Sequence, residues 1–247
     1  MIKSFRDLAK LPRSMWVLGV ATLVNRVGTM ALPYLALYLT RDRGFPVTTA
    51  GMVIALYGVV ALIVGPIAGR LSDKFGPVRV MEISLFLTGV VLILFPLAHS
   101  IPSIIGMAML WSLISEAYRP ASMSLTGQLV PVSQRKTAYA FMRLSVNLGM
   151  SVGPVVGGLL AKISYPAIFV VDGSTTLMAC AFLILMGFKA HAKKSSESVK
   201  ETALPDTHHL KPISNPGFVF FSFSDDSSYR GFLSTYFDNA RIFSSRS

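Results

Sequence analysis

Charged residues are scarce in this sequence of 247 residues: only 14% are Asp, Glu, Lys or Arg, whereas 52% are hydrophobic. A water-soluble domain usually carries about a quarter charged residues. Too few ionic groups remain to cover a surface that faces water, so an ordinary soluble globule is excluded. The mean hydropathy of +0.57 indicates a membrane protein instead.

Cysteine and histidine are also scarce. The single cysteine, Cys180, excludes an intrachain disulfide and a cysteine-based metal cluster, and its apolar surroundings predict an inert buried thiol. The four histidines, which fall in expected loops or the tail, are His99, His191, His208 and His209. No Gly-x-x-x-x-Gly-Lys-Ser/Thr sequence for ATP occurs. The sequence therefore predicts no enzyme, no metal and no cofactor.

Long apolar runs dominate the sequence. A helix needs about 20 apolar residues to cross a bilayer, and we expect six such spans, near residues 15–39, 47–69, 80–98, 102–127, 138–161 and 164–188. The fold class predicted is an all-α membrane protein. Its expected parts are a cytoplasmic N-terminus over 1–14, a six-helix transmembrane bundle over 15–188, and a cytoplasmic linker with an aberrant or truncated tail over 189–247.

The basic residues predict an orientation. With a cytoplasmic N-terminus, twelve Lys and Arg residues of the first 194 fall inside and three outside. This is the positive-inside bias of membrane proteins, and it favours the cell membrane as the location. The net charge of +11 mainly belongs to these loops, so it does not indicate a nucleic-acid partner.

One sequence pattern occurs twice. Gly65-Pro66 followed by Gly69 in the second span is repeated by Gly153-Pro154 followed by Gly157 in the fifth, 88 positions later. The two spans would run in opposite directions, so the repeated pattern predicts three-plus-three inverted repeats, as in secondary transporters. Glycine and proline are also frequent in membrane helices, so coincidence remains open.

The segment after the second span contains Gly69, Leu71, Asp73 and Gly76 at fixed spacing. It resembles the signature loop of the major facilitator superfamily, Gly-x-Leu-Ala-Asp-Arg-x-Gly-Arg-Lys. We expect its glycines to permit a tight cytoplasmic turn, and Asp73 and Lys74 to gate the cytoplasmic side. The residues carried over are Gly69, Leu71, Asp73, Lys74, Gly76 and Arg79, the last one place late.

The fifth span resembles a motif of the drug/proton antiporter branch of that family. Its glycines recur every fourth residue and would share one closely packed face, and its proline would kink the helix. The residues are Gly149, Gly153, Pro154, Gly157 and Gly158. The resemblance covers residues 15–190. It implies one half of a twelve-helix transporter that exports small, drug-like molecules, coupled to protons, by alternating access.

Five ionisable residues fall inside the expected spans, where charge is costly. We hypothesise two pairs, Glu116 with Arg143 and Asp172 with Arg26, although Glu116 and Arg119 could pair on one helix. They are candidates for cavity polarity or a proton relay, and permanent structural pairing remains open. In the fourth span, Arg119 occupies the basic position of a family motif whose Gln-Gly part is missing.

The expected partners are the lipid bilayer, a small-molecule substrate and a proton. An apolar run begins at Pro216 and stops at Ser224, too short to cross a bilayer. We expect either a truncated or frame-shifted product or a short protein that dimerises, so a second transporter half or a homodimer is a further expected partner. A non-transporting membrane remnant or assembly partner is the alternative function.

Overall fold

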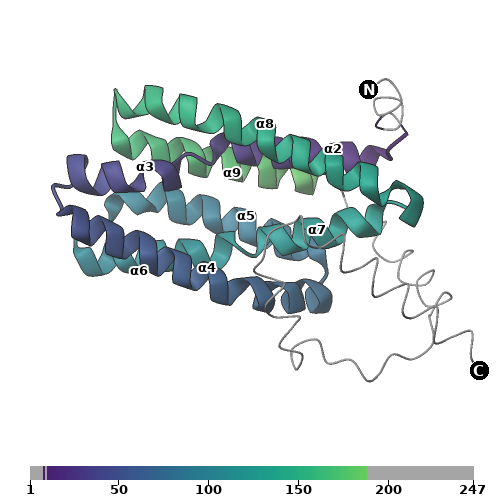
Figure 1. Ribbon diagram of the computed structural model, residues 1–247, viewed down its shortest axis with the longest axis horizontal. Coiled ribbons are helices and arrows are strands. Elements are labelled where there is room, and N and C mark those ends of the chain that lie inside the picture. Colours follow the sequence, from purple (N-terminus) through teal and green to yellow (C-terminus); the bar gives the residue numbers. More distant parts are fainter. Residues whose placement is uncertain (1–7, 9, 188–247) are drawn as a thin grey trace, which may run out of the picture. The chain divides into compact units, whose positions relative to one another are not determined.

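The computed structural model describes Leu8 and residues 10–187, and within these residues it contains helices and no strand (Figure 1). Six helical segments are long and apolar enough to cross a membrane, which confirms the expected six-span, all-α architecture. They are Arg13–Asp42, Val47–Phe75, Pro77–Leu97, Ile101–Leu129, Val132–Ala161 and Tyr165–Leu185. The expected tail over 189–247 lies outside the described residues.

The first and fourth spans are each interrupted near their middle, which the sequence analysis did not predict. The first consists of α2 (Arg13–Gly28) and α3 (Ala31–Leu37), continued by a π-helical turn (Tyr38–Asp42). The fourth consists of α6 (Ile101–Ser115) and α7 (Tyr118–Leu129).

A proline follows each interruption at the same distance. Pro33 stands four residues after Thr29, and Pro120 stands four residues after Glu116. Proline has no N–H to donate to the carbonyl four residues earlier, and its ring clashes with that carbonyl. Both spans therefore lose a helical hydrogen bond where the helix is interrupted. The two prolines are 87 positions apart, which extends the predicted repeat.

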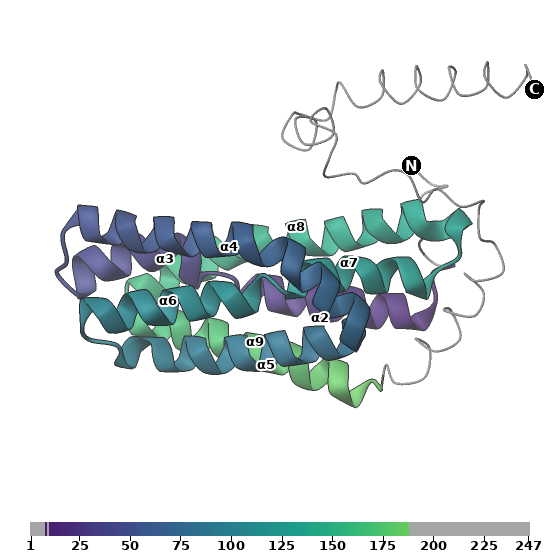
Figure 2. The same cartoon turned by 90° about the horizontal axis from the view of Figure 1, so that it is seen from below.

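The remaining spans contain α4 (Val47–Phe75), α5 (Pro77–Leu94), α8 (Arg135–Ala161) and α9 (Tyr165–Leu185). Short 3₁₀ turns occur at Phe95–Leu97 and Val132–Gln134. Successive spans run antiparallel (Figure 2).

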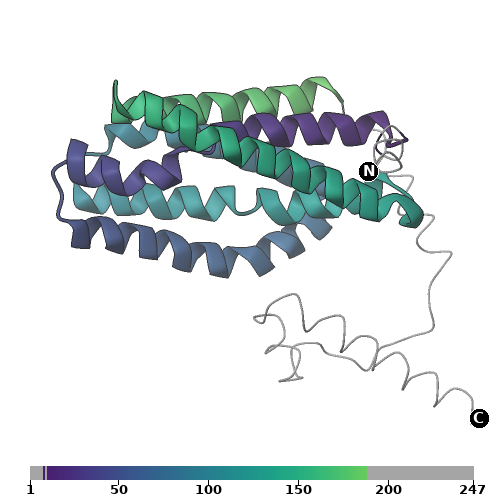
Figure 3. The same cartoon turned by 45° about the horizontal axis from the view of Figure 1, so that its top comes forward.

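Each interrupted span packs against helices of the opposite repeat. In the first span, α2 contacts α8 and α9, and Figure 3 shows α8 crossing in front of it. In the fourth span, α6 contacts α4 and α5, and α7 contacts α5. Contact between α5 and α9 joins the two groups. The three-plus-three arrangement is thus interlocked rather than split into two separate bundles.

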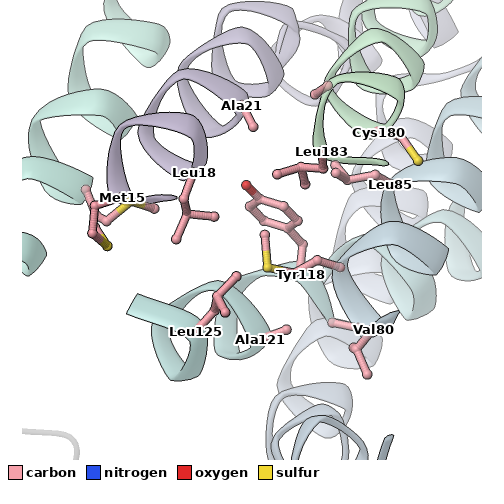
Figure 4. Close-up of a cluster of buried hydrophobic side chains, with 14 of the residues drawn as sticks. Met15, Leu18, Ala21, Val80, Leu85, Tyr118, Ala121, Leu125, Cys180 and Leu183 are labelled. Carbon is pink, nitrogen blue, oxygen red and sulfur yellow. The ribbon is translucent and has the colours of Figure 1, made fainter. Parts of the chain in front are cut away.

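Two apolar clusters fill the interior of the described bundle. One surrounds Tyr118, whose hydroxyl points toward α2 (Figure 4) and lies 2.8 Å from the Thr22 hydroxyl. Cys180 is buried in this cluster, as expected. The other cluster is aromatic, and the rings of Phe95 and Phe169 stack there with centroids 4.7 Å apart.

Candidate functional site

Several polar side chains of the fourth span are exposed or half-buried. Buried residues such as Tyr118, Ala121 and Leu125 point into the bundle, whereas the opposite side of α7 is exposed or half-buried. The polar residues of this span that are exposed or half-buried include Glu116, between α6 and α7, and Arg119, Ser124 and Gln128, at different positions around α7.

Helix α8 carries a row of polar side chains with a spacing of four. Residues four apart share one face of a helix, and here all four members are exposed: Tyr139, Arg143, Asn147 and Ser151. The two helices contact each other. We call these polar residues of the two spans together the α7–α8 polar face, which consists of Glu116, Arg119, Ser124, Gln128, Tyr139, Arg143, Asn147 and Ser151.

The exposed side chains of other spans are mostly apolar, and α7 and α8 also expose apolar residues such as Met123 and Leu144. Helix α4 exposes Leu62 and Ile63, and α9 exposes Met178 and Ile184. Such surfaces suit lipid chains, whereas ionisable residues within membrane spans face a protein interior or a water-filled cavity. The α7–α8 polar face is therefore the surface best suited to line an aqueous path.

The expected Asp172–Arg26 ion pair is absent from the described part of the chain. The buried Asp172 carboxylate instead accepts hydrogen bonds from the backbone N–H groups of Met30 (3.2 Å) and Ala31 (2.9 Å). These N–H groups lie at the start of α3 after the interruption; the Met30 N–H also donates to the Gly28 carbonyl at 2.6 Å, whereas Asp172 is the acceptor for the Ala31 N–H. A carboxylate is favourable there because of its charge-assisted hydrogen bonds and the helix dipole.

A side chain at the equivalent position of the other repeat binds the backbone near the interruption of the fourth span. Ser84, 88 positions before Asp172, lies on α5, and its hydroxyl donates to the Ile114 carbonyl at 2.7 Å. Side chains of α9 and α5 thus bind the backbone of the first and fourth spans, respectively. Ser84 was not among the residues expected from the sequence, although the repeat offset points to it.

The expected Glu116–Arg143 pair is not formed either, and no Glu116–Arg119 ion pair occurs among residues 10–187. Glu116 is half-buried, and Arg119 and Arg143 are exposed. The only ion pair between described residues links Arg43 and Asp42 at 3.7 Å, near the end of the first span. Both intramembrane pairing hypotheses are therefore wrong for this conformation.

Arg26, on the first span, lies where this span meets the fourth and fifth spans. Its guanidinium carbon is 5.9 Å from the centroid of the Tyr118 ring. Its Nε is buried and has no hydrogen-bond partner within the described chain. A Cβ added at Gly149 would collide with the Cβ of Arg26, so α8 approaches α2 closely at this point.

The predicted glycine face of α8 packs against the interruption of the first span. A Cβ added at Gly153 would lie 3.2 Å from the carbonyl oxygens of Val27 and Thr29, and one at Gly157 would lie 2.7 Å from the Tyr34 ring. At Gly158 the distance to the Tyr34 hydroxyl would be 3.0 Å. The helix continues through Pro154, whose carbonyl accepts a hydrogen bond from Tyr34 (2.9 Å).

The signature segment is mostly helix rather than the expected loop. Helix α4 continues to Phe75, because the chain from Gly69 onward keeps its helical hydrogen bonds, and Gly69 makes no turn. Only Gly76, with φ +87°, turns the chain into α5. Leu71, Asp73, Lys74 and Arg79 are exposed, and Gly69 and Gly76 are half-buried.

The sequence analysis also missed part of the α7–α8 polar face. Tyr139, Asn147 and Ser151 recur at four-residue intervals around Arg143, and this regular spacing was the available signal. Within the described residues, no group of three or more His, Cys, Asp or Glu residues could hold a metal ion.

A six-span bundle of inverted repeats, with interrupted helices and a polar outer face, has the architecture of a membrane transporter. Comparison with known families agrees: the profile of the Major Facilitator Superfamily matches residues 18–238. The chain belongs to the major facilitator superfamily, a family of transporters.

Two relatives show the level of similarity. The uncharacterized MFS-type transporter YqjV of Bacillus subtilis is 29% identical over 157 residues, which are 63% of this chain and 38% of YqjV. The quinolone resistance protein NorA of Staphylococcus aureus is 25% identical over 169 residues, 68% of this chain and 43% of NorA. The chain thus matches about two-fifths of the length of each relative.

Proposed function

We propose that this chain forms one half of a secondary transporter that moves small organic molecules by alternating access. The observation that carries the proposal is the α7–α8 polar face, which sets charged and hydrogen-bonding groups on the outside of an otherwise apolar bundle. Interrupted membrane helices and inverted repeats are features that transporters of this kind use around their binding sites.

The transport direction and energy source belong to the same proposal: efflux of drug-like molecules driven by a proton gradient. The likeness to the quinolone resistance protein NorA supports the substrate type. Burial favours a neutral carboxyl group and a nearby guanidinium favours a charged one, so a carboxylate that changes neighbours can take up and release a proton. The proposed relay consists of Arg26, Glu116, Arg119, Arg143 and Asp172.

Two other groups have proposed roles in the conformational cycle. Asp73 and Lys74, at the end of α4, gate the cytoplasmic side. The glycine face of α8 forms a close helix–helix contact with the first span, about which the two can move. The proposed location is the cell membrane, with the N-terminus in the cytoplasm, because the basic loops then lie inside.

A direct experiment measures dye transport in everted membrane vesicles that contain the full chain. We expect accumulation of a fluorescent amphiphilic dye after an inward-acidic pH gradient is imposed, and loss of accumulation when a protonophore collapses the gradient. Dye accumulation that ignores the gradient would contradict proton coupling, and no chain-dependent accumulation would contradict transport.

The proton relay is tested in the same vesicles with Glu116→Gln and Asp172→Asn. Each change removes a titratable carboxyl group at nearly constant size. We expect at least one variant to lose gradient-driven accumulation, whereas Asp42→Asn, at the exposed end of the first span, should keep it. Unchanged coupling in both variants would eliminate the proposed carboxylate role.

The alternative function is a membrane assembly partner that does not transport. It is favoured by the outer side of α4, where a Cβ added at Gly51, Gly58, Gly65 or Gly69 would meet nothing within 4 Å. Small residues let another helix approach closely. Disulfide crosslinking of Gly58→Cys in a Cys180→Ser background distinguishes the cases: a symmetric dimer supports transport by two copies, and a monomer without a partner supports a non-transporting chain.

A further inference from the structure

Two arginines lie level with each other on the α7–α8 polar face. The Tyr139 hydroxyl donates to the Met123 carbonyl at 3.2 Å, so this side chain reaches from α8 onto α7. The two helices run antiparallel (Figure 1). The residue four positions before Met123 on α7 and the residue four positions after Tyr139 on α8 therefore lie at the same height along the helix pair. Those two positions are Arg119 and Arg143.

The two side chains present like charges on one surface. At 1.5 Å per residue, each lies about 6 Å along its helix from the Tyr139–Met123 contact. Both are exposed, and neither forms an ion pair or a side-chain hydrogen bond with another described residue. Two such like charges on one surface repel each other.

The nearby carboxylates compensate this positive charge only in part. Asp172 is buried and bound to the backbone of the first span. Glu116 is the only acidic member of the α7–α8 polar face. Arg26 adds a third guanidinium: it packs at Gly149, six residues beyond Arg143, which is about 9 Å along α8.

We infer that Arg119 and Arg143 form a binding site for an organic carboxylate, taken up from the aqueous path as substrate. The inference rests on the proposed function and narrows its substrate class to amphiphilic anions. A guanidinium presents several N–H donors in a planar fork that matches the two oxygens of a carboxylate. A single carboxylate between the arginines would remove their repulsion and accept a charge-assisted hydrogen bond from each.

The test compares two probes of nearly equal size, 2-naphthoate and 2-naphthamide, which differ in charge. Binding of each is measured by fluorescence titration of the purified full chain in phosphatidylcholine nanodiscs. We expect naphthoate to bind about tenfold more tightly than naphthamide, since hydrogen bonds to charged groups are the stronger ones.

Matched variants assign the binding to these arginines. Arg119→Gln and Arg143→Gln should each weaken naphthoate binding about tenfold and leave naphthamide binding unchanged. The conservative Arg143→Lys should retain part of the preference, because the charge remains while the fork is lost. Arg41→Gln, exposed at the far end of the first span, is the control and should bind like the unchanged chain.

Three results would overturn the inference: equal affinity for the two probes, an equal loss for both probes in the Arg→Gln variants, or an equal effect of Arg41→Gln. A fourth would be loss of naphthoate binding when phosphatidylglycerol is added to the nanodiscs, which would assign the arginines to lipid phosphate. Failure of the proposed function gives a different pattern, with arginine-dependent naphthoate binding but no transport in vesicles.

Discussion

Asp172 shows what a single carboxylate does inside this bundle. Its charge is stabilised by two backbone N–H groups at the start of α3, rather than by an arginine side chain. The Ala31 N–H is available to Asp172 because the first span is interrupted between Gly28 and Ala31, and the Met30 N–H is shared with the Gly28 carbonyl. The residue therefore stabilises the geometry of the interruption, and its loss would leave the Ala31 N–H without this acceptor.

We predict that Asp172→Ala lowers the free energy of unfolding by about 1–3 kcal/mol, because the Ala31 N–H loses its acceptor while the Met30 N–H keeps only the Gly28 carbonyl. Asp172→Asn should cost less, since its carbonyl oxygen can still accept. Thermal unfolding of the purified protein in detergent measures both. The exposed Asp73→Ala is the control and should change little. Equal stabilities of Asp172→Ala and the unchanged chain would contradict this role.

At the scale of the helix, the repeated Gly-Pro pattern leads to two different environments. On α8, Gly153 and Gly157 contact the first span, whereas Gly65 and Gly69 on α4 have open space around them. The same local sequence thus supports close packing in one repeat and an uncovered surface in the other. The difference arises because the two copies do not present this side of the helix to equivalent neighbours.

This difference predicts opposite effects of one substitution. Gly157→Ala should destabilise the protein by about 1–3 kcal/mol, because its Cβ would lie 2.7 Å from the Tyr34 ring and force a shift. Gly69→Ala should be neutral or slightly stabilising, because alanine favours a helix and meets no neighbour. Chemical denaturation of the two variants in parallel tests this. Equal destabilisation by both would show that the contact does not matter.

The interrupted fourth span gives a second prediction at this scale. Pro120→Ala would restore an N–H that can donate to the Glu116 carbonyl, so the helix should become more continuous. We expect several-fold slower hydrogen–deuterium exchange over residues 116–121. Pro131→Ala, in the exposed turn after α7, should leave exchange in that segment unchanged. Unchanged exchange in Pro120→Ala would mean that packing, rather than proline, sets the interruption.

At the scale of the whole chain, the six spans and basic loops predict which turns share a side of the membrane. Ser133→Cys and Ser100→Cys, each in a Cys180→Ser background, place one thiol on either end of the bundle. In intact cells, a membrane-impermeant maleimide should label Ser100→Cys and leave Ser133→Cys unlabelled until the cells are opened. The reverse pattern would overturn the proposed orientation.

Much of the architecture could be predicted because the hydrophobic requirement of a bilayer is local. A span needs a continuous apolar run, and each of the six runs is visible without knowledge of its neighbours. The expected boundaries were less accurate: α4 extends to Phe75 because helical hydrogen bonding continues past the last apolar residues. The expected pairing of Asp172 with Arg26 was wrong because depth in the membrane does not specify which backbone lies nearby.

Span number, all-α class, repeat pattern and family signature follow from the amino-acid sequence alone, since hydropathy and residue spacing act along one helix at a time. Only the tertiary structure decided that Asp172 binds backbone donors, that Ser84 holds the other interrupted span, and that Arg119 lies level with Arg143. These relations depend on how closely and in what register separate helices approach. That approach is set by small residues and interrupted helices acting together in three dimensions.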